Sequence, residues 1–151
     1  MIADLEKIKH FCAYQERCHS EVRSKLLEMK VYGAELEEFI AILIEENFLN
    51  EERFARAFAR GKFSLKHWGK FKIKHELKAR NISSTLIQIA LKEIDEVDYE
   101  NTLRHLAEKK WDSLRAEKNF FVKMNKLKNY LLQKGFEGEW VYECVRRMGE
   151  G

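Results

Sequence analysis

Residues 73–94 read IKHELKARNISSTLIQIALKEI, and the apolar residues of this stretch recur at regular spacings. Ile73 and Leu77 are four residues apart, Ile82 follows five residues later, and apolar residues follow Ile82 at +4, +8 and +12. Apolar residues four apart lie on one face of an α-helix. Asn81 can supply the left-handed residue that ends a helix, and the serines after Ile82 suit an N-cap. The stretch therefore predicts two amphipathic helices joined by a tight turn.

The same spacing occurs at two other places in the chain, and this self-similarity predicts a repeat protein. The three apolar triplets are Val22, Leu26 and Val31; Ile73, Leu77 and Ile82; and Leu127, Leu131 and Phe136. A further amphipathic segment precedes each pair of helices, in residues 5–17, 51–63 and 99–114. We therefore predict three tandem three-helix repeats: an acidic repeat over residues 1–49, a basic repeat over 50–97 and a third over 98–151.

Composition agrees with an all-α fold. The 151 residues include no proline, 35% are charged and 45% are apolar. So large a charged fraction indicates that much of the chain lies at the solvated surface, and we expect an elongated, curved array of repeats. Cys12, Cys18 and Cys144 include no CxxC pair, and we interpret them as reduced, buried thiols. No run of 18 apolar residues and no signal-peptide pattern occurs, so we expect a cytoplasmic protein without a membrane segment.

The net charge of +3 conceals a basic middle segment. Residues 53–92 contain 11 basic side chains and one acidic, a net charge of +10, whereas residues 1–52 have a net charge of −6. Phe63, Trp68 and Phe71 lie among these cations, an arrangement that suits phosphate contacts and base stacking. The predicted binding residues are Arg53, Arg56, Arg60, Lys62, Lys66, Lys70, Lys72, Lys74 and Lys78. The alternative is that the aromatics belong to the core and the lysines are merely solvated.

Within this segment the arginines at 53, 56 and 60 share one helix face, and the segment lacks acids of its own to compensate its charge. A second group of lysines, in residues 109–128, surrounds Trp111, Phe120, Phe121 and Met124. Helical spacing with the leucines that follow favours these four apolar residues as core.

Catalytic motifs are absent from the sequence. The five histidines form no HExxH spacing, and no GxxxxGK[ST], GxGxxG or GxSxG string occurs. We therefore expect a binding protein that is not an enzyme and that uses neither a cofactor nor a metal ion.

Four strings resemble the RecX family, regulators of the bacterial RecA recombinase: HSEVRSKLLEMKV at 19–31, FLNEERFARAFARGKF at 48–63, IKHELKARNI at 73–82 and KLKNYLLQKGF at 126–136. The resemblance implies three three-helix repeats that bind the RecA filament on single-stranded DNA and inhibit its recombinase, ATPase and co-protease activities. It also implies that Arg53, Arg56 and Arg60 belong to the contact surface. Asn50 and Glu51 depart from the two aspartates that the family prefers, and Asn81 replaces a glycine.

Two other functions are compatible with the residues alone. One is a helix-turn-helix protein that binds nucleic acid by itself, and the other is a helical-repeat adaptor for another protein. For each of these three functions we expect a monomer.

Overall fold

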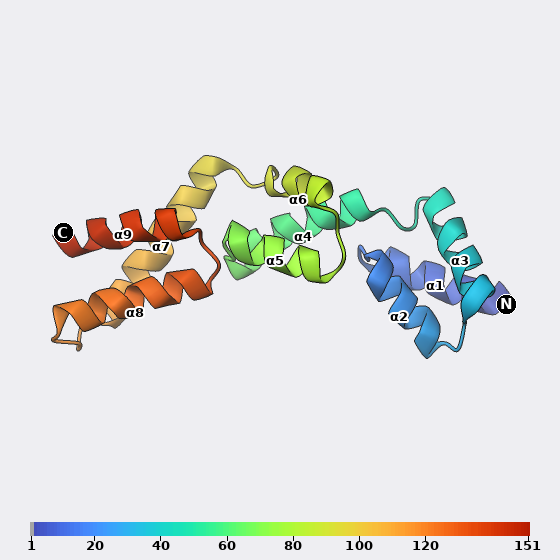
Figure 1. The fold of residues 1–151 in the computed structure, drawn as a ribbon, viewed down its shortest axis with the longest axis horizontal. Helices are drawn as coiled ribbons and strands as arrows, with labels where there is room; N and C mark the ends of the chain where they lie inside the picture. Colours follow the sequence, from blue (N-terminus) through green and yellow to red (C-terminus); the bar gives the residue numbers. More distant parts are fainter. Residues whose placement is uncertain (1) are drawn as a thin grey trace. The chain divides into compact units, whose positions relative to one another are not determined.

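The computed structural model describes residues 2–151, and those residues form α-helices and no β-strand (Figure 1). The helices are α1 (Ile2–Tyr14), α2 (His19–Glu28), α3 (Gly33–Glu45), α4 (Glu51–Lys66), α5 (Lys70–Ala79), α6 (Ser84–Leu91), α7 (Glu96–Ser113), α8 (Phe120–Gln133) and α9 (Gly138–Glu150). The predicted all-α fold of three-helix repeats is confirmed. The repeat boundaries and the elongated, curved arrangement stay predictions.

The same hydrogen bond closes the second helix of every repeat. The amide of Val31 donates to the carbonyl of Leu26, and Ile82 and Phe136 donate in the same way to Leu77 and Leu131. This bond, from one residue to the fifth before it, belongs to the Schellman motif and needs a left-handed residue just before the donor. Those residues are Lys30, Asn81 and Gly135, whose φ angles are 64°, 61° and 97°. The left-handed residue predicted at Asn81 is confirmed, and Gly135 and Lys30 take the same conformation at the other two turns.

Side chains cap the starts of two helices, one of them at a serine after Ile82 as predicted. The amide of Leu86 donates to the Ser83 hydroxyl, and the amide of Arg53 donates to the Asn50 side chain at 3.0 Å. Side chains that accept from the first turn satisfy amides that have no partner within the helix. The departure at Asn50 therefore keeps the start of α4 intact.

All nine residues of the three apolar triplets are buried. The positions that follow Ile82 are only partly as predicted, because Ala90 and Ile94 are buried but Ile87 is buried in place of Leu86. A spacing of four exceeds the helical repeat of 3.6 residues, so the expected stripe turns about 40° away from the core with each step. The residue next to the expected position is then the buried one.

The predicted amphipathic segment 51–63 lies in α4, and its buried face is narrow. Phe54 is buried, whereas Ala57, Phe58 and Gly61 are only half-buried. The fully buried partners are two alanines, at 55 and 59. Alanine contributes little to a hydrophobic pattern, and so periodicity does not distinguish these two residues as core.

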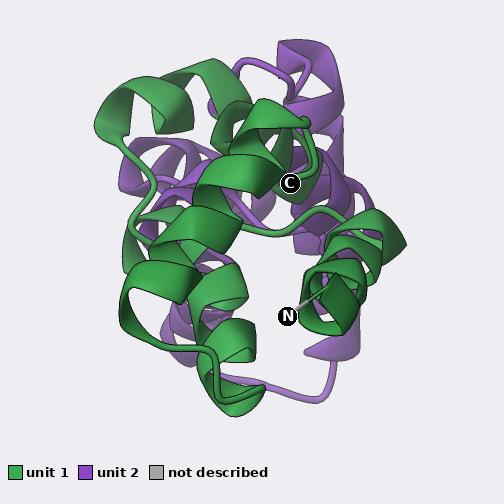
Figure 2. Ribbon diagram, turned by 90° about the vertical axis from the view of Figure 1, so that its right-hand side faces the viewer, with its two compact units in different colours: residues 1–58, 76–90 green, residues 59–75, 91–151 purple. Residues whose placement is uncertain are grey.

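The backbone divides into two compact units that do not coincide with the repeats (Figure 2). Unit one consists of residues 1–58 and 76–90, and unit two of residues 59–75 and 91–151. Both α4 and α5 are thus shared between units. In unit one a core of aliphatic and aromatic side chains surrounds Ile8, Leu26 and Leu43. In unit two α7, α8 and α9 each contact the other two helices.

Candidate nucleic-acid interface

The first two arginines of the predicted row lie in unit one and have carboxylate partners. Arg53 Nε lies 2.7 Å from Glu16 Oε2, and its guanidinium also donates to the carbonyl of Asn47. Arg53 therefore connects the start of α4 to two residues that precede the helix, Glu16 and Asn47. Arg56 Nε lies 3.1 Å from Glu52 Oε2, one helical turn away.

The third arginine lies in unit two, where Arg60 Nη1 is 3.4 Å from Glu93 Oε1. Glutamates at 16, 52 and 93, all outside the basic segment, thus supply carboxylates to the three arginines. Sequence reasoning missed these acids because they lie at or beyond the ends of the segment. Exposed ion pairs contribute only about 0–1 kcal/mol, so Arg56 and Arg60, whose side chains are 41% and 53% exposed, can exchange their glutamate partners for a phosphate.

Two lysines of unit two lie over the Trp68 ring, and two more lie close to them. Lys62 Nζ and Lys72 Nζ lie 5.0 Å and 4.5 Å from the centre of the Trp68 ring, both within the range of cation–π attraction. Lys134 Nζ donates to the carbonyl of Lys66 at 2.9 Å. We call Lys62, Lys66, Lys72 and Lys134 the lysine cluster.

Like charges crowd one another in the lysine cluster. Burial lowers the pKa of Lys134, and the positive charges of Lys72 and Lys66 lower that pKa further. A bound anion would relieve this repulsion, because an opposite charge nearby favours the charged form of an ammonium group. Lysine binds phosphate as a point charge. The cluster can therefore hold a phosphate group.

A close backbone contact brings Lys134 to the other lysines. The amide of Gly69 donates to the carbonyl of Lys134 at 2.8 Å, and the amide of Phe71 donates to the carbonyl of Gly135 at 2.9 Å. A Cβ atom on Gly69 would lie only 2.3 Å from the carbonyl carbon of Gly135. Because Lys134 lies more than 60 positions from Lys66 in the chain, sequence reasoning missed it. The only local sign of this contact in the sequence is the pair Lys134-Gly135 at the turn after α8.

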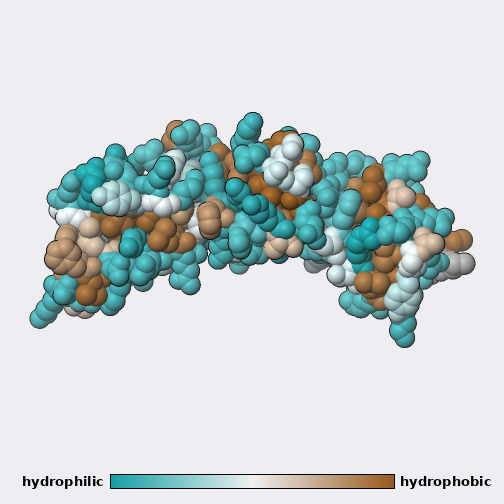
Figure 3. All heavy atoms as spheres, viewed as in Figure 1, coloured by the Kyte–Doolittle hydropathy of each residue, from teal (hydrophilic) through white to brown (hydrophobic). Residues whose placement is uncertain are grey.

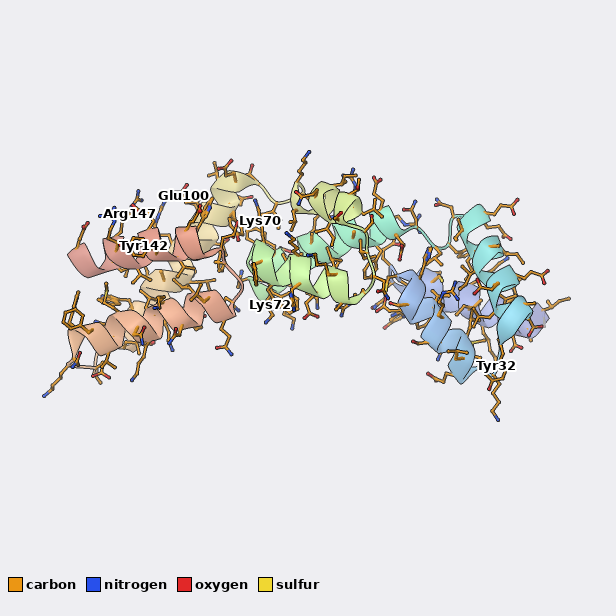
Figure 4. All side chains as sticks on the ribbon, in the orientation of Figure 1. Tyr32, Lys70, Lys72, Glu100, Tyr142 and Arg147 are labelled. Atoms are coloured by element: carbon orange, nitrogen blue, oxygen red, sulfur yellow. The ribbon has the colours of Figure 1, made fainter. Side chains whose placement is uncertain are left out.

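A buried tyrosine fixes the start of α5. The phenol oxygen of Tyr99 accepts from the amide of Lys70 at 2.8 Å and donates to the carboxylate of Glu137. Burial raises the pKa of Tyr99, and the hydrogen bond to Glu137 raises it further. Lys70 Nζ lies 4.7 Å from the centre of the Tyr99 ring. Figure 4 shows Lys70 and Lys72 together at the first turn of α5.

The aromatics of the basic segment play different roles. Phe63 packs against Tyr99, with the ring centres 5.7 Å apart, so it belongs to the packing. Phe71 is 63% exposed and stacks on His75. Of the two lysines that complete the predicted set, Lys74 is half-buried and Lys78 is exposed. Phe71 is thus the aromatic of α5 that a base could reach.

The cysteines are free thiols: Cys12 and Cys18 are buried and Cys144 is half-buried. Burial raises the pKa of the Cys12 thiol to about 11, so it is a poor nucleophile at neutral pH. Among residues 2–151 no three His, Cys, Asp or Glu side chains come together as metal ligands. No helix in that range has the length and apolar character needed to cross a bilayer.

Comparison with known proteins gives matches to one family. The family model described as "RecX, second three-helix domain" matches residues 50–91, and that described as "RecX, third three-helix domain" matches residues 98–145. The regulatory protein RecX of Clostridium perfringens strain 13 is 31% identical over 133 residues, which are 87% of this chain and 62% of the relative. That of Clostridium botulinum strain Eklund 17B is 32% identical over 132 residues, which are 86% of this chain and 61% of the relative. The chain thus spans about three-fifths of the length of these curated relatives.

Two solved structures share the fold. A crystal structure of regulatory protein RecX superposes with a TM-score of 0.85 at 20% identity, covering 97% of this chain and 71% of the other. RecX from Lactobacillus salivarius superposes with a TM-score of 0.79 at 24% identity, covering 97% of both chains. Since the two domain models together match more than half of the residues, the chain belongs to the RecX family of regulatory proteins.

Proposed function

We propose that this protein binds the RecA filament on single-stranded DNA and inhibits the recombinase, ATPase and co-protease activities of that filament without catalysing a reaction. Family membership supports the regulatory role, since the relatives are named regulatory proteins. The observation that carries the DNA-facing part is the lysine cluster, in which Lys62 and Lys72 lie over Trp68 and the ammonium group of Lys134 feels the charges of Lys72 and Lys66.

In this proposal the lysine cluster holds DNA phosphates inside the filament, and Phe71 stacks on an exposed base. Neither contact has to be strong, because several linked sites on one chain reinforce each other. Arg56 and Arg60 exchange their glutamate partners for phosphate or for acidic groups of RecA, whereas Arg53 stabilises the start of α4. The protein would act in the cytoplasm as a monomer that occupies several filament subunits.

A helix-turn-helix protein acting by itself on DNA is the alternative. In such a protein the second helix of the α5–α6 pair would read base edges, a task that favours arginine, lysine or amide side chains. The α6 helix, STLIQIAL, offers no basic residue and only Gln88 as an amide. This composition favours the filament regulator. An adaptor for a different protein would leave RecA's ATP hydrolysis unchanged.

The test is RecA's ATP hydrolysis on single-stranded DNA, with this protein titrated from far below to above the RecA concentration. A fall at substoichiometric levels supports the proposal. Replacing Lys66, Lys72 and Lys134 together by glutamine should raise the half-inhibitory concentration about tenfold or more, because three charged phosphate contacts are lost.

The matched control replaces Lys92, Lys109 and Lys118 by glutamine. These three lysines are exposed and lie outside the lysine cluster, so the net charge changes equally. If both triple variants weaken inhibition equally, the lysine cluster is not the DNA contact. If the unsubstituted protein leaves ATP hydrolysis unchanged even in excess, the proposed function is wrong and the adaptor or independent DNA binder takes its place.

A further inference from the structure

The third repeat carries an open apolar groove between α8 and α9. It has a volume of about 810 Å³, and Phe121, Val122, Tyr142 and Val145 are among its lining residues. Phe121 is 81% exposed and Tyr142 is 70% exposed, so the expectation that Phe121 belongs to the core was wrong. Apolar surface is visible over this helix pair in Figure 3, and Figure 4 shows Tyr142 on α9. Large exposed apolar residues gathered in one groove are typical of a protein-binding site.

The rim of the groove is cationic. Lys126, Lys128 and Arg146 line it, and none of the described residues that line it is acidic. Lys126 pairs with Glu117 at 3.1 Å, and Arg146 pairs with Glu143 and Glu150 on its own helix. Such exposed pairs are weak, so the carboxylates of a partner can replace them.

A second groove of the same repeat has the opposite charge. It lies between α7 and α9, and five glutamates and two arginines line it, among them Glu100 and Arg147 (Figure 4). An acidic segment would be repelled there and attracted to the α8–α9 groove. The charge pattern of the third repeat therefore favours an acidic partner and directs it to the α8–α9 groove.

The shape of the α8–α9 groove favours a helix. A groove between two packed helices accepts the side-chain ridge of a further helix, and α7 already contacts both α8 and α9. Residues 2–151 contain no strand, so this surface offers no sheet edge to an extended peptide. A partner helix would complete a four-helix arrangement over a small core.

We propose that the α8–α9 groove binds an acidic amphipathic helix of a partner protein, which places its apolar face on Phe121 and Tyr142 and its carboxylates beside Lys128 and Arg146. A second copy of this chain is a poor occupant. Its acidic helix is α3, and the main apolar face of α3, Leu36, Phe39, Ile40 and Leu43, is buried in its own repeat, which leaves Ile44 as the exposed large apolar residue of that helix. The inference does not depend on the proposed function.

The experiment measures binding of the full chain to a fluorescein-labelled synthetic helix of 18 residues with a leucine face and glutamates elsewhere. The comparison probe has the same leucine face with lysines in place of the glutamates. We expect the acidic helix to bind at least about tenfold more tightly, and added salt to weaken its binding.

Matched variants locate the contact. Tyr142→Ser should weaken binding of the acidic helix about tenfold, the loss expected for an aromatic anchor. Tyr32→Ser changes another exposed tyrosine, 59% exposed in the first repeat, and should leave binding unchanged. Circular dichroism verifies that both variants fold, and Phe121→Ser, at the other exposed aromatic of the groove, gives an independent measurement.

Four outcomes would overturn the proposal. The first is equal binding of the two probes, the second is equal effects of Tyr142→Ser and Tyr32→Ser, and the third is no detectable binding of the acidic helix. A dimer in sedimentation equilibrium that Tyr142→Ser dissociates would instead identify a second copy as the occupant, and it would overturn the proposal too.

Discussion

Ile82 lies five positions after Leu77, as Val31 lies five positions after Leu26, because one hydrogen bond sets this distance. The amide of the later residue donates to the carbonyl of the earlier one, and both side chains are buried. In a Schellman motif the hydrophobic contact and the hydrogen bond come together. The spacing that identifies the repeat is therefore the signature of a helix end.

In the basic segment, glycine is required at position 69 but not at position 61. A Cβ atom on Gly69 would lie 2.3 Å from backbone atoms of Gly135, whereas one on Gly61, inside α4, would have no neighbour within 4 Å. Gly69→Ala should lower the free energy of unfolding by about 2–4 kcal/mol, because backbone atoms must move apart.

Gly61→Ala adds the same methyl group and is the control. It should raise the free energy of unfolding by about 0.5–1 kcal/mol, because alanine favours a helix interior. Urea unfolding followed by circular dichroism measures both values. Equal effects of the two substitutions would show that the contact between Gly69 and Gly135 is not tight in solution.

Tyr99 should make stability depend on pH in alkaline solution. An unfolded tyrosine has a pKa of about 10, and burial together with Glu137 raises the pKa of Tyr99 in the folded protein. The stabilisation is complete below about pH 10 and is lost as the pH rises further, because only the unfolded state then releases the proton. Tyr99→Phe should cost about 1–2 kcal/mol at pH 7.

Between about pH 9 and about pH 11, urea unfolding should show a steeper loss of stability for the unsubstituted protein than for Tyr99→Phe. The other tyrosines and the lysines titrate in both proteins, so the difference between the curves isolates Tyr99. Parallel curves would mean that the phenol is not buried beside Glu137.

At the scale of helices, the sequence predicted most of the fold and only part of the site. Helix faces and turns leave local signals, such as the apolar triplets, Asn81 and Ser83. Contacts between distant residues leave none: neither the approach of Lys134 to Lys66 nor the pairing of Arg53 with Glu16 follows from periodicity. The exposure of Phe121 was missed for a similar reason, because helical spacing does not say whether a neighbour covers a face.

The surface of α5 should contribute to DNA binding without contributing much to stability. Phe71→Ala removes a side chain that is 63% exposed, so the free energy of unfolding should change by no more than about 0.5 kcal/mol. If Phe71 stacks on a base, its loss should cost about 1–3 kcal/mol of binding. Fluorescence anisotropy with a labelled thymine oligonucleotide, in the presence of RecA, measures this cost. Tyr32→Ala, at another exposed aromatic, should have no effect, and the same weakening in both variants would argue against stacking.

At the scale of the whole molecule, the three repeats of the sequence and the two compact units of the structure predict different unfolding behaviour. Residues 59–75 belong to the second repeat by sequence, yet they pack with the third repeat in unit two. Tyr99 and the Gly69–Gly135 contact account for this packing. Deleting residues 98–151 would therefore also remove the packing partners of 59–75, and a loss of inhibition by such a truncated chain would not isolate the contribution of the third repeat.

Hydrogen exchange measured by mass spectrometry distinguishes the two organisations, because cooperative units open together. Leu26→Ala and Leu131→Ala each remove a fully buried side chain and should cost about 2–5 kcal/mol. If the compact units are the cooperative units, Leu131→Ala should speed exchange in residues 59–75 together with 91–151, and Leu26→Ala should speed it in residues 2–58 and 76–90. Peptides from the two ends of α5 would then respond to different substitutions. If all of residues 50–97 respond as one block, the repeats are the cooperative units, and truncation between residues 97 and 98 becomes a valid test of how many repeats inhibition requires.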